Sequence, residues 1–317
     1  MFTLFKEKKG FTFVELIFVI IILGVISSIG SSAIVQTYES YILQRSVHSA
    51  SINTELAINQ LANRLTYRMD LSLLARQPGR TGTVEGTDFY PARSVPLEKR
   101  NDYRALEWIS YDSDSFEAYE APSWSGYADL IASSFATVIS TGSDNTKLNS
   151  IIKHYTGTTD GSGGALRFMT ARYDSNLSRG YSSACLYGGS ATGCLFPVNI
   201  GSDKTSFDFP AAGAGDRTAG AMLYSEFYQY ATSAFAVVPE NEGTINGLKV
   251  YDLTLYYGYQ PWQGENYKNG RSATLLKNVS VFRFRKEENS IRLKLCVIER
   301  INDTDEISIC KEKAVIR

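Results

Sequence analysis

The sequence predicts an α+β protein in which one long N-terminal helix packs against an antiparallel, β-rich domain. Between Gly10 and Tyr38 the only charged residue is Glu15, so this part of the chain is one apolar run. All eight prolines lie at Pro78 or later, which leaves the preceding segment free to form an unbroken helix. Later segments are rich in tyrosine and in short runs that are typical of strands.

The bulk composition is that of a folded protein with one or two domains. The 317 residues are 44% hydrophobic and carry a formal net charge of -1. This balance gives no basic domain of the kind that nucleic acid requires, so direct nucleic-acid binding is not indicated. We predict a leader at 1–10, an N-terminal helix at 11–70 and an exported globular domain at 71–317. Within the helix, 11–35 is predicted to cross a membrane and 36–70 to form an amphipathic stalk.

The N-terminal apolar run is long enough to span a bilayer. A hydrocarbon core of ~30 Å needs about 20 helical residues, and Leu16 to Val35 supplies them. Lys6, Lys8 and Lys9 precede this run. By the positive-inside rule they place the N-terminus in the cytoplasm and the rest of the chain outside.

The alternatives are a cleaved secretory signal and a simple signal anchor. A secretory signal has an apolar core of about 7–15 residues that ends at a small-residue cleavage site. Here the run is longer and continues without proline into an amphipathic pattern. Glu15 also argues against both alternatives, because a carboxylate inside a membrane helix costs roughly 2.5–3.5 kcal/mol. Such a residue is expected to have a partner.

The stretch Lys8-Lys9-Gly10-Phe11-Thr12-Phe13-Val14-Glu15-Leu16 resembles the processing signal of type IV prepilins and type II secretion pseudopilins. The resemblance implies a pilin-like fold, cleavage by prepilin peptidase between Gly10 and Phe11, and methylation of the new Phe11 amine. It also implies other pilin or pseudopilin subunits and inner-membrane assembly machinery as partners. The expected location is the bacterial inner membrane, with the C-terminal domain periplasmic, and then a filament or the cell surface. Many members have a proline midway along this helix, which this chain lacks.

Glu15 lies four residues from the amine that cleavage would create. It can therefore approach that amine on the same helix or on a neighbouring subunit. Pairing of the two charges in an apolar medium would set the axial register of assembly. The alternative is a charge tolerated at the membrane interface.

Beyond Val35, small or apolar residues recur every three or four positions and predict a helical stripe that docks on the globular domain. Its members are Leu43, Val47, Ala50, Thr54, Ile58, Leu61 and Leu65. Ile42, Ile52 and Leu56 lie off this stripe. They form either a second contact face between subunits or scattered surface positions.

The rest of the chain predicts mostly strands. We expect strands at Ala165 to Tyr173, Phe235 to Val238, Leu248 to Tyr257, Leu275 to Phe284, Ile291 to Arg300 and Ile307 to Ile316, and short helices at Ala128 to Thr137 and Lys147 to Tyr155. The last two strands form a hairpin, and a turn centred on Asp303 places Cys296 opposite Cys310, which predicts a disulfide. The same register sets Lys311 and Lys313 opposite leucines, so a bulge or shifted pairing is an alternative there.

Cys185 and Cys194 enclose a glycine-rich loop and predict a second disulfide. Closing a loop of about ten residues stabilises a fold by ~2–3 kcal/mol. A redox pair is less favoured because the spacing is not C-x-x-C. Disulfides require an oxidising compartment, which agrees with export.

We predict that the chain is not an enzyme and has no cofactor or catalytic metal. His48 and His154 are the only histidines, and no nucleophile elbow, Walker loop or zinc-protease motif occurs. Two clusters of acidic residues could bind calcium, but solvated turns are the favoured interpretation. The clusters are Asp112, Asp114 and Glu117, and Asp303, Asp305 and Glu306. The aromatic residues between Tyr251 and Tyr267 either pack within the domain or form an adhesive patch.

These observations favour a minor pilin or pseudopilin that primes or caps a filament in adhesion, motility, DNA uptake or secretion. A binding module carried at a filament tip is the second hypothesis. A membrane-anchored periplasmic enzyme is the third, and the absence of a catalytic motif disfavours it.

Overall fold

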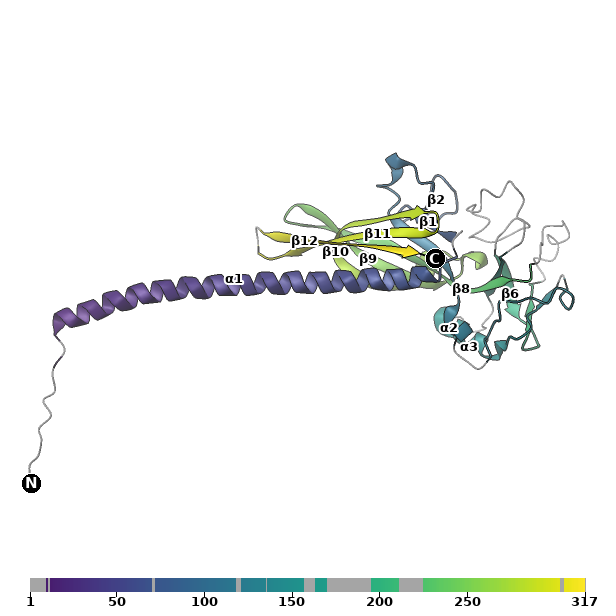
Figure 1. Cartoon of the computed structure of the whole chain (residues 1–317). Coiled ribbons are helices and arrows are strands. Elements are labelled where there is room, and N and C mark those ends of the chain that lie inside the picture. The colour runs from purple at the N-terminus through teal and green to yellow at the C-terminus, as the bar shows by residue number, and fades with distance from the viewer. Residues whose placement is uncertain are drawn as a thin grey trace, which may run out of the picture.

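The computed structural model describes residue 10 and residues 12–69, 72–117, 121–134, 136–156, 163–169, 195–210, 225–302 and 305–316. One long helix projects from a β-rich body, as Figure 1 shows. The helix α1 covers Phe13–Thr66, and its 54 residues extend about 80 Å. The prediction of an α+β class, with a long N-terminal helix and an antiparallel sheet, is confirmed.

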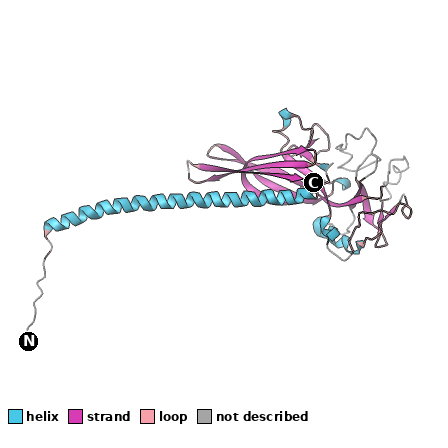
Figure 2. Cartoon of the chain, viewed as in Figure 1, coloured by secondary structure: helices cyan, strands magenta, loops and turns pink. Residues whose placement is uncertain are grey.

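The remaining elements are short helices and twelve strands within the described residues, coloured by type in Figure 2. The helices are α2 (Ser113–Glu117) and α3 (Leu148–Thr156). The strands are β1 (Leu74–Arg76), β2 (Phe89–Pro91), β3 (Ala105–Tyr111), β4 (Thr137–Ile139), β5 (Gly164–Phe168), β6 (Phe196–Ile200), β7 (Ser206–Asp208), β8 (Tyr228–Ile245), β9 (Leu248–Tyr259), β10 (Arg271–Glu287), β11 (Ser290–Arg300) and β12 (Glu306–Ile316).

The described strands pair in the order β12-β11-β10-β9-β8-β5-β6-β7-β4, and β3 also pairs with β8 and carries β1 and β2. Each of these pairings is antiparallel. The long strands β8 to β12 follow one another as hairpins. The turn between β8 and β9 is Asn246-Gly247, with φ of 47° and 83°. Asn-Gly is the preferred sequence for a two-residue hairpin turn because both residues tolerate positive φ.

The core of the described residues has three clusters of buried apolar side chains, and the first of them holds the helix. One cluster lies between the C-terminal half of α1 and the long strands and includes Leu61, Trp108, Val237, Leu253 and Leu295. Another fills a lobe built from α3 and β4 to β7, beyond the C-terminal end of α1. The helix therefore contacts the body along only part of its length.

The predicted helix at Ala128 to Thr137 is wrong. Turns and a bridge between Asp129 and Ile139 occupy this region instead. Asp129 Oδ1 accepts hydrogen bonds from the backbone N–H groups of Ile131 and Ala132. Such local side-chain bonds compete with helical hydrogen bonds and favour turns.

Candidate processing and assembly segment

The helix begins directly after the predicted processing position. Gly10 is exposed and precedes Thr12, whose hydroxyl accepts a hydrogen bond from the backbone N–H of Glu15 at 3.4 Å. Thr12 is thus the N-cap of α1, and Glu15 places its negative charge in the first turn, where the helix dipole favours it. The Glu15 side chain is exposed and has no partner among the described residues.

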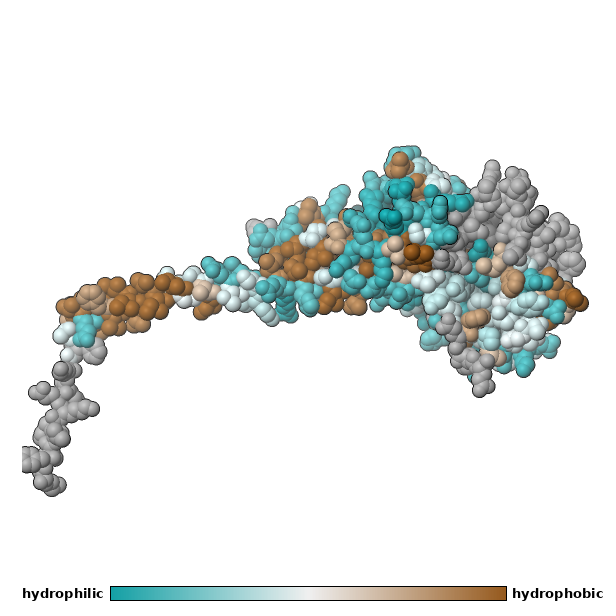
Figure 3. Space-filling view, in the orientation of Figure 1, coloured by the Kyte–Doolittle hydropathy of each residue, from teal (hydrophilic) through white to brown (hydrophobic). Residues whose placement is uncertain are grey.

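The first half of α1 is apolar and bare. Its large apolar side chains from Phe13 to Val35 are exposed. Among the described residues, α1 is the one helix that is long and apolar enough to cross a membrane. Figure 3 shows this half of the helix as a continuous hydrophobic surface. No part of that apolar span is buried against the body. Its apolar surface is therefore available to a bilayer or to other helices.

The middle of the helix continues without a break through the serine-rich stretch. Ser32 donates a hydrogen bond from its hydroxyl to the carbonyl of Ile29, and Thr37 donates to that of Ala33. Figure 1 shows a gentle curve here and no sharp kink. Hydroxyl bonds to a preceding carbonyl commonly bend a helix in this manner.

The predicted docking stripe is confirmed from Ala50 onward. Thr54, Ile58, Leu61 and Leu65 are buried, as are the flanking alanines. The first two members of the stripe, Leu43 and Val47, are 41% and 40% exposed. Of the residues predicted off the stripe, Ile52 and Leu56 are 44% and 55% exposed, whereas Ile42 is half-buried.

The end of α1 is fixed to β3 by backbone hydrogen bonds. Met69 N–H donates to the Ile109 carbonyl at 2.8 Å, and Tyr111 N–H donates to the Tyr67 carbonyl at 3.0 Å. The buried Arg68 side chain donates to the Leu65 carbonyl at 2.8 Å and so satisfies a carbonyl in the last turn of the helix. These contacts hold the direction of the helix relative to the sheet.

The hairpin of β11 and β12 has the register predicted from the sequence. Cys296 pairs with Cys310 and forms a disulfide whose Cα atoms are 4.0 Å apart. The pairing continues without a bulge through Lys311 and Lys313, so the alternative of a shifted register is wrong. Both lysines reach α1, because Lys311 Nζ lies 3.5 Å from a Glu55 carboxylate oxygen and Lys313 donates to Asn59 Oδ1 at 2.5 Å.

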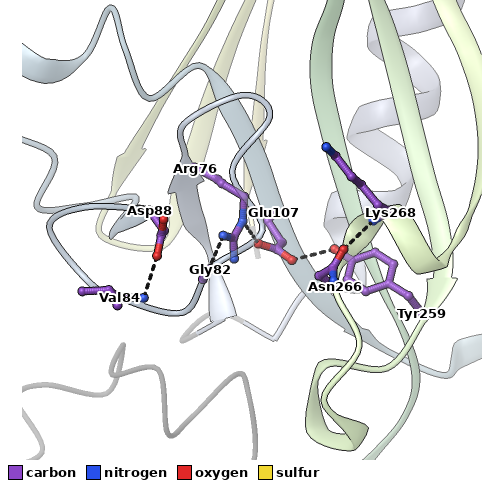
Figure 4. Close-up of polar contacts among 8 residues, drawn as sticks. All are labelled: Arg76, Gly82, Val84, Asp88, Glu107, Tyr259, Asn266 and Lys268. Carbon is purple, nitrogen blue, oxygen red and sulfur yellow. Dashed lines mark hydrogen bonds and ion pairs between the residues drawn. The ribbon is translucent and has the colours of Figure 1, made fainter.

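A buried ion pair joins three strands inside the domain (Figure 4). Arg76 Nε on β1 lies 2.7 Å from Glu107 Oε2 on β3, and both side chains are 1% exposed. The hydroxyl of Tyr259 on β9 donates to the other oxygen of Glu107 at 2.8 Å. Burial, with the Glu107 charge as a further cause, raises the pKa of Tyr259 well above its usual range. Breaking such a pair leaves a buried charge unpaired, which costs about 3–5 kcal/mol.

Two of the residues named as alternative calcium ligands, Asp112 and Asp305, make hydrogen bonds within the fold. The buried Asp112 accepts hydrogen bonds from the backbone N–H and the hydroxyl of Ser115 at the start of α2. Burial raises the pKa of Asp112. In the last hairpin, Asp305 N–H donates to Asn302 Oδ1 at 2.7 Å. Asp303 lies outside the described residues.

The aromatic residues between Tyr251 and Tyr267 pack within the domain. Tyr259 and Tyr267 are fully buried, and Tyr251 and Trp262 are 6% and 5% exposed. Trp262 donates its indole N–H to the Gly163 carbonyl at 2.7 Å. The packing interpretation is therefore the correct one for these four side chains.

Several predicted site residues lie outside the described residues: Lys6, Lys8, Lys9, Phe11, Cys185 and Cys194. The N-cap role of Thr12 was missed, although the sequence carries its signal. Thr12 and Glu15 have the T-x-x-E spacing that is typical of helix N-termini. The contacts of Lys311 and Lys313 with α1 were also missed, since no local pattern links β12 to residues so distant in the chain.

The N-terminal segment matches one family model. The model of the prokaryotic N-terminal methylation motif covers residues 5–31, which include the predicted cleavage position, Glu15 and most of the apolar run. No curated protein and no solved structure matches the chain. The motif implies processing by prepilin peptidase and assembly with pilin subunits, and with the apolar helix it indicates membrane anchoring. The chain thus carries a prokaryotic N-terminal methylation motif on an α+β fold with a long N-terminal helix, which is consistent with the type IV prepilin-like family.

Proposed function

We propose that this protein is a minor pilin or pseudopilin. After processing it is incorporated into a type IV pilus or a type II secretion-like filament, where it primes or caps assembly. Prepilin peptidase cleaves between Gly10 and Phe11, and the cytoplasmic leader is removed. The β-rich domain is exported to the periplasm and later lies on a filament or at the cell surface.

The observation that carries this proposal is the division of α1. The methylation motif and the apolar surface that follows it lie on a half of the helix that the protein does not bury itself. A helix with exposed apolar side chains all around it requires a lipid or protein environment. A filament of packed helices supplies that environment after the subunit leaves the bilayer, and no separate anchor is needed.

A structural role, rather than catalysis, is part of the proposal. Among the described residues, the buried Arg76 and Glu107 charges pair with each other within the packed domain. Such a pair is suited to holding strands together. The large domain then presents a specific surface at one position of the filament.

The proposal is tested by substituting Glu15 in cells that carry the cognate assembly system. We expect Glu15→Ala to be cleaved normally but to enter the filament at least about 10-fold less, because the charge that sets the register is lost. Glu39→Ala is the matched control, since Glu39 is also exposed on α1 but lies beyond the apolar run. Processing is followed by the mobility shift on leader removal, and assembly by immunoblot of sheared filaments.

Glu15→Gln removes the charge but keeps the shape of the side chain. It should reduce assembly as much as Glu15→Ala if the charge is what sets the register. The assembly role is excluded if Glu15→Ala protein is recovered in filaments as efficiently as the wild type. A loss of cleavage in Gly10→Val, with membrane insertion retained, would independently support processing at the predicted position.

A further inference from the structure

A basic pocket lies between the loop that follows β2 and the strands β10 to β12. It has a volume of about 230 Å³. We call it the arginine pocket, after its basic lining residues: Arg100, Arg104, Arg283, Arg285, Arg292 and Lys294. The acidic residue that lines it is Glu312, and Tyr103 and Phe284 contribute aromatic walls.

The arginine pocket keeps an excess of positive charge after its ion pairs are counted. Glu242 pairs with Arg104 at 2.8 Å, and Glu312 pairs with Lys294 at 2.7 Å. Glu287 pairs with two of the arginines, at 3.3 and 3.0 Å. Six cations against these three carboxylates leave a charge of +3, in a chain whose net charge is -1. The pocket is therefore a local exception to a near-neutral protein.

Arg283 is held in place without being neutralised. Its guanidinium donates to the Arg100 carbonyl at 3.3 Å and to Asn101 Oδ1 at 2.6 Å, and both acceptors are uncharged. Holding one cation beside others costs Coulomb energy, which an anion would remove. Burial raises the pKa of Tyr251, and the nearby charges of Arg104 and Arg283 oppose that rise, as expected for a positive local field. The pocket is thus arranged in advance for a negatively charged group.

We propose that the arginine pocket binds a carboxylate-bearing segment of a neighbouring protein subunit. The planar guanidinium matches a carboxylate through two parallel hydrogen bonds. The volume is below the ~300–1,000 Å³ of typical small-molecule pockets and holds a side-chain carboxylate with its stem, as an inserted acidic residue requires. The proposed function supplies the neighbour, since a filament subunit contacts other subunits, and the binding itself does not require assembly.

The experiment measures binding to the unassembled full-length chain in a neutral detergent. The probe is a short fluorescent oligoglutamate peptide, followed by polarisation at an ionic strength of about 0.15 M. We expect the double variant Arg100→Gln with Arg283→Gln to weaken binding at least about 10-fold. The matched control is Arg271→Gln with Lys277→Gln, which removes the same charge from exposed positions of β10 outside the pocket. Thermal unfolding of each variant confirms that the domain is intact.

A short DNA duplex of equal charge is the competing probe. Tighter binding of the duplex, dependent on Arg100 and Arg283, would replace the acidic segment with nucleic acid and overturn the proposal. Equal losses in the pocket variant and the control would show unspecific attraction, and absence of peptide binding would also exclude the site. Because Glu15 is unchanged and no filament forms, these outcomes are independent of whether the assembly proposal holds.

Discussion

The two halves of α1 have the same backbone structure and opposite surroundings. From Phe13 to Val35 the helix is apolar except for Glu15 and a few serines, and it is not covered by the protein. From Ala50 to Leu65 it has one buried stripe, and its remaining surface is polar or only sparsely apolar. The first half stays helical because its backbone hydrogen bonds are internal, and the second half is also stabilised by the sheet.

This difference assigns the folding of the domain to the second half of the helix and leaves the first half for the proposed assembly. Substitutions in the second half should change the stability of the domain, whereas those in the first half should change only membrane and filament behaviour. Leu43 and Val47 lie at the junction, where the predicted stripe continues but its side chains are 41% and 40% exposed.

The strongest test of this separation compares two leucines on α1. Leu61 is 1% exposed and Leu23 is 56% exposed. We expect Leu61→Ala to lower the free energy of unfolding of the domain by about 2–5 kcal/mol, because it leaves a cavity in the core. Leu23→Ala should change it by less than ~0.5 kcal/mol. Urea unfolding of the full chain in a neutral detergent measures both.

Equal effects of Leu61→Ala and Leu23→Ala would contradict the division of the helix. A smaller effect of Leu61→Ala than of Leu56→Ala would contradict the observed docking face, since Leu56 is 55% exposed.

The disulfide provides the next test, because it links β11 to β12, the strand that packs on the second half of α1. Replacing both Cys296 and Cys310 with serine removes a loop constraint with a sequence separation of 14, which is worth ~3 kcal/mol in the chain-entropy account. We expect a matching loss of unfolding free energy, with assembly of the first half unaffected. The control is Ser308→Ala on the same strand, which should have little effect. An unchanged stability in the double variant would show that the hairpin does not depend on the disulfide.

The smallest effect is expected at the ion pair between helix and sheet. Lys311→Ala removes the contact with Glu55, and since both side chains are partly exposed the loss should be below about 1 kcal/mol. The loss should shrink as salt is added. Glu55→Ala should have a similar effect, and the two losses should not add in the double variant. A fully additive double variant would show that the pair does not interact.

The sequence predicted those features that depend on short-range patterns. The apolar run, the spacing of Thr54, Ile58, Leu61 and Leu65, and the two-residue alternation around Cys296 each specify one face of one element. The fold class, the docking stripe from Ala50 onward and the register of the last hairpin followed from them. The assembly role of Glu15 stays a prediction, since its expected partner is the amine of Phe11.

Other elements depend on contacts that no local pattern records. The strand β3 has buried residues on both faces, so it lacks the alternation that identifies a half-buried strand. It contains Glu107, which is tolerated there because Arg76 and Tyr259 come from distant parts of the chain. The arginine pocket is likewise built from the loop after β2 and from β10 to β12, and only the fold brings them together.

The lysines of β12 have a consequence for how subunits meet. Among the described strands β12 has β11 as its one neighbour, so its outer edge carries unpaired backbone groups that a strand from another chain could join. Lys311, Glu312 and Lys313 place three charges along this edge strand, two of them directed to the helix. A strand added there would crowd and desolvate these charges, which is how natural sheets prevent edge-to-edge aggregation. The charged edge therefore suits the proposed assembly, in which copies meet through their helices and not by fusion of their sheets.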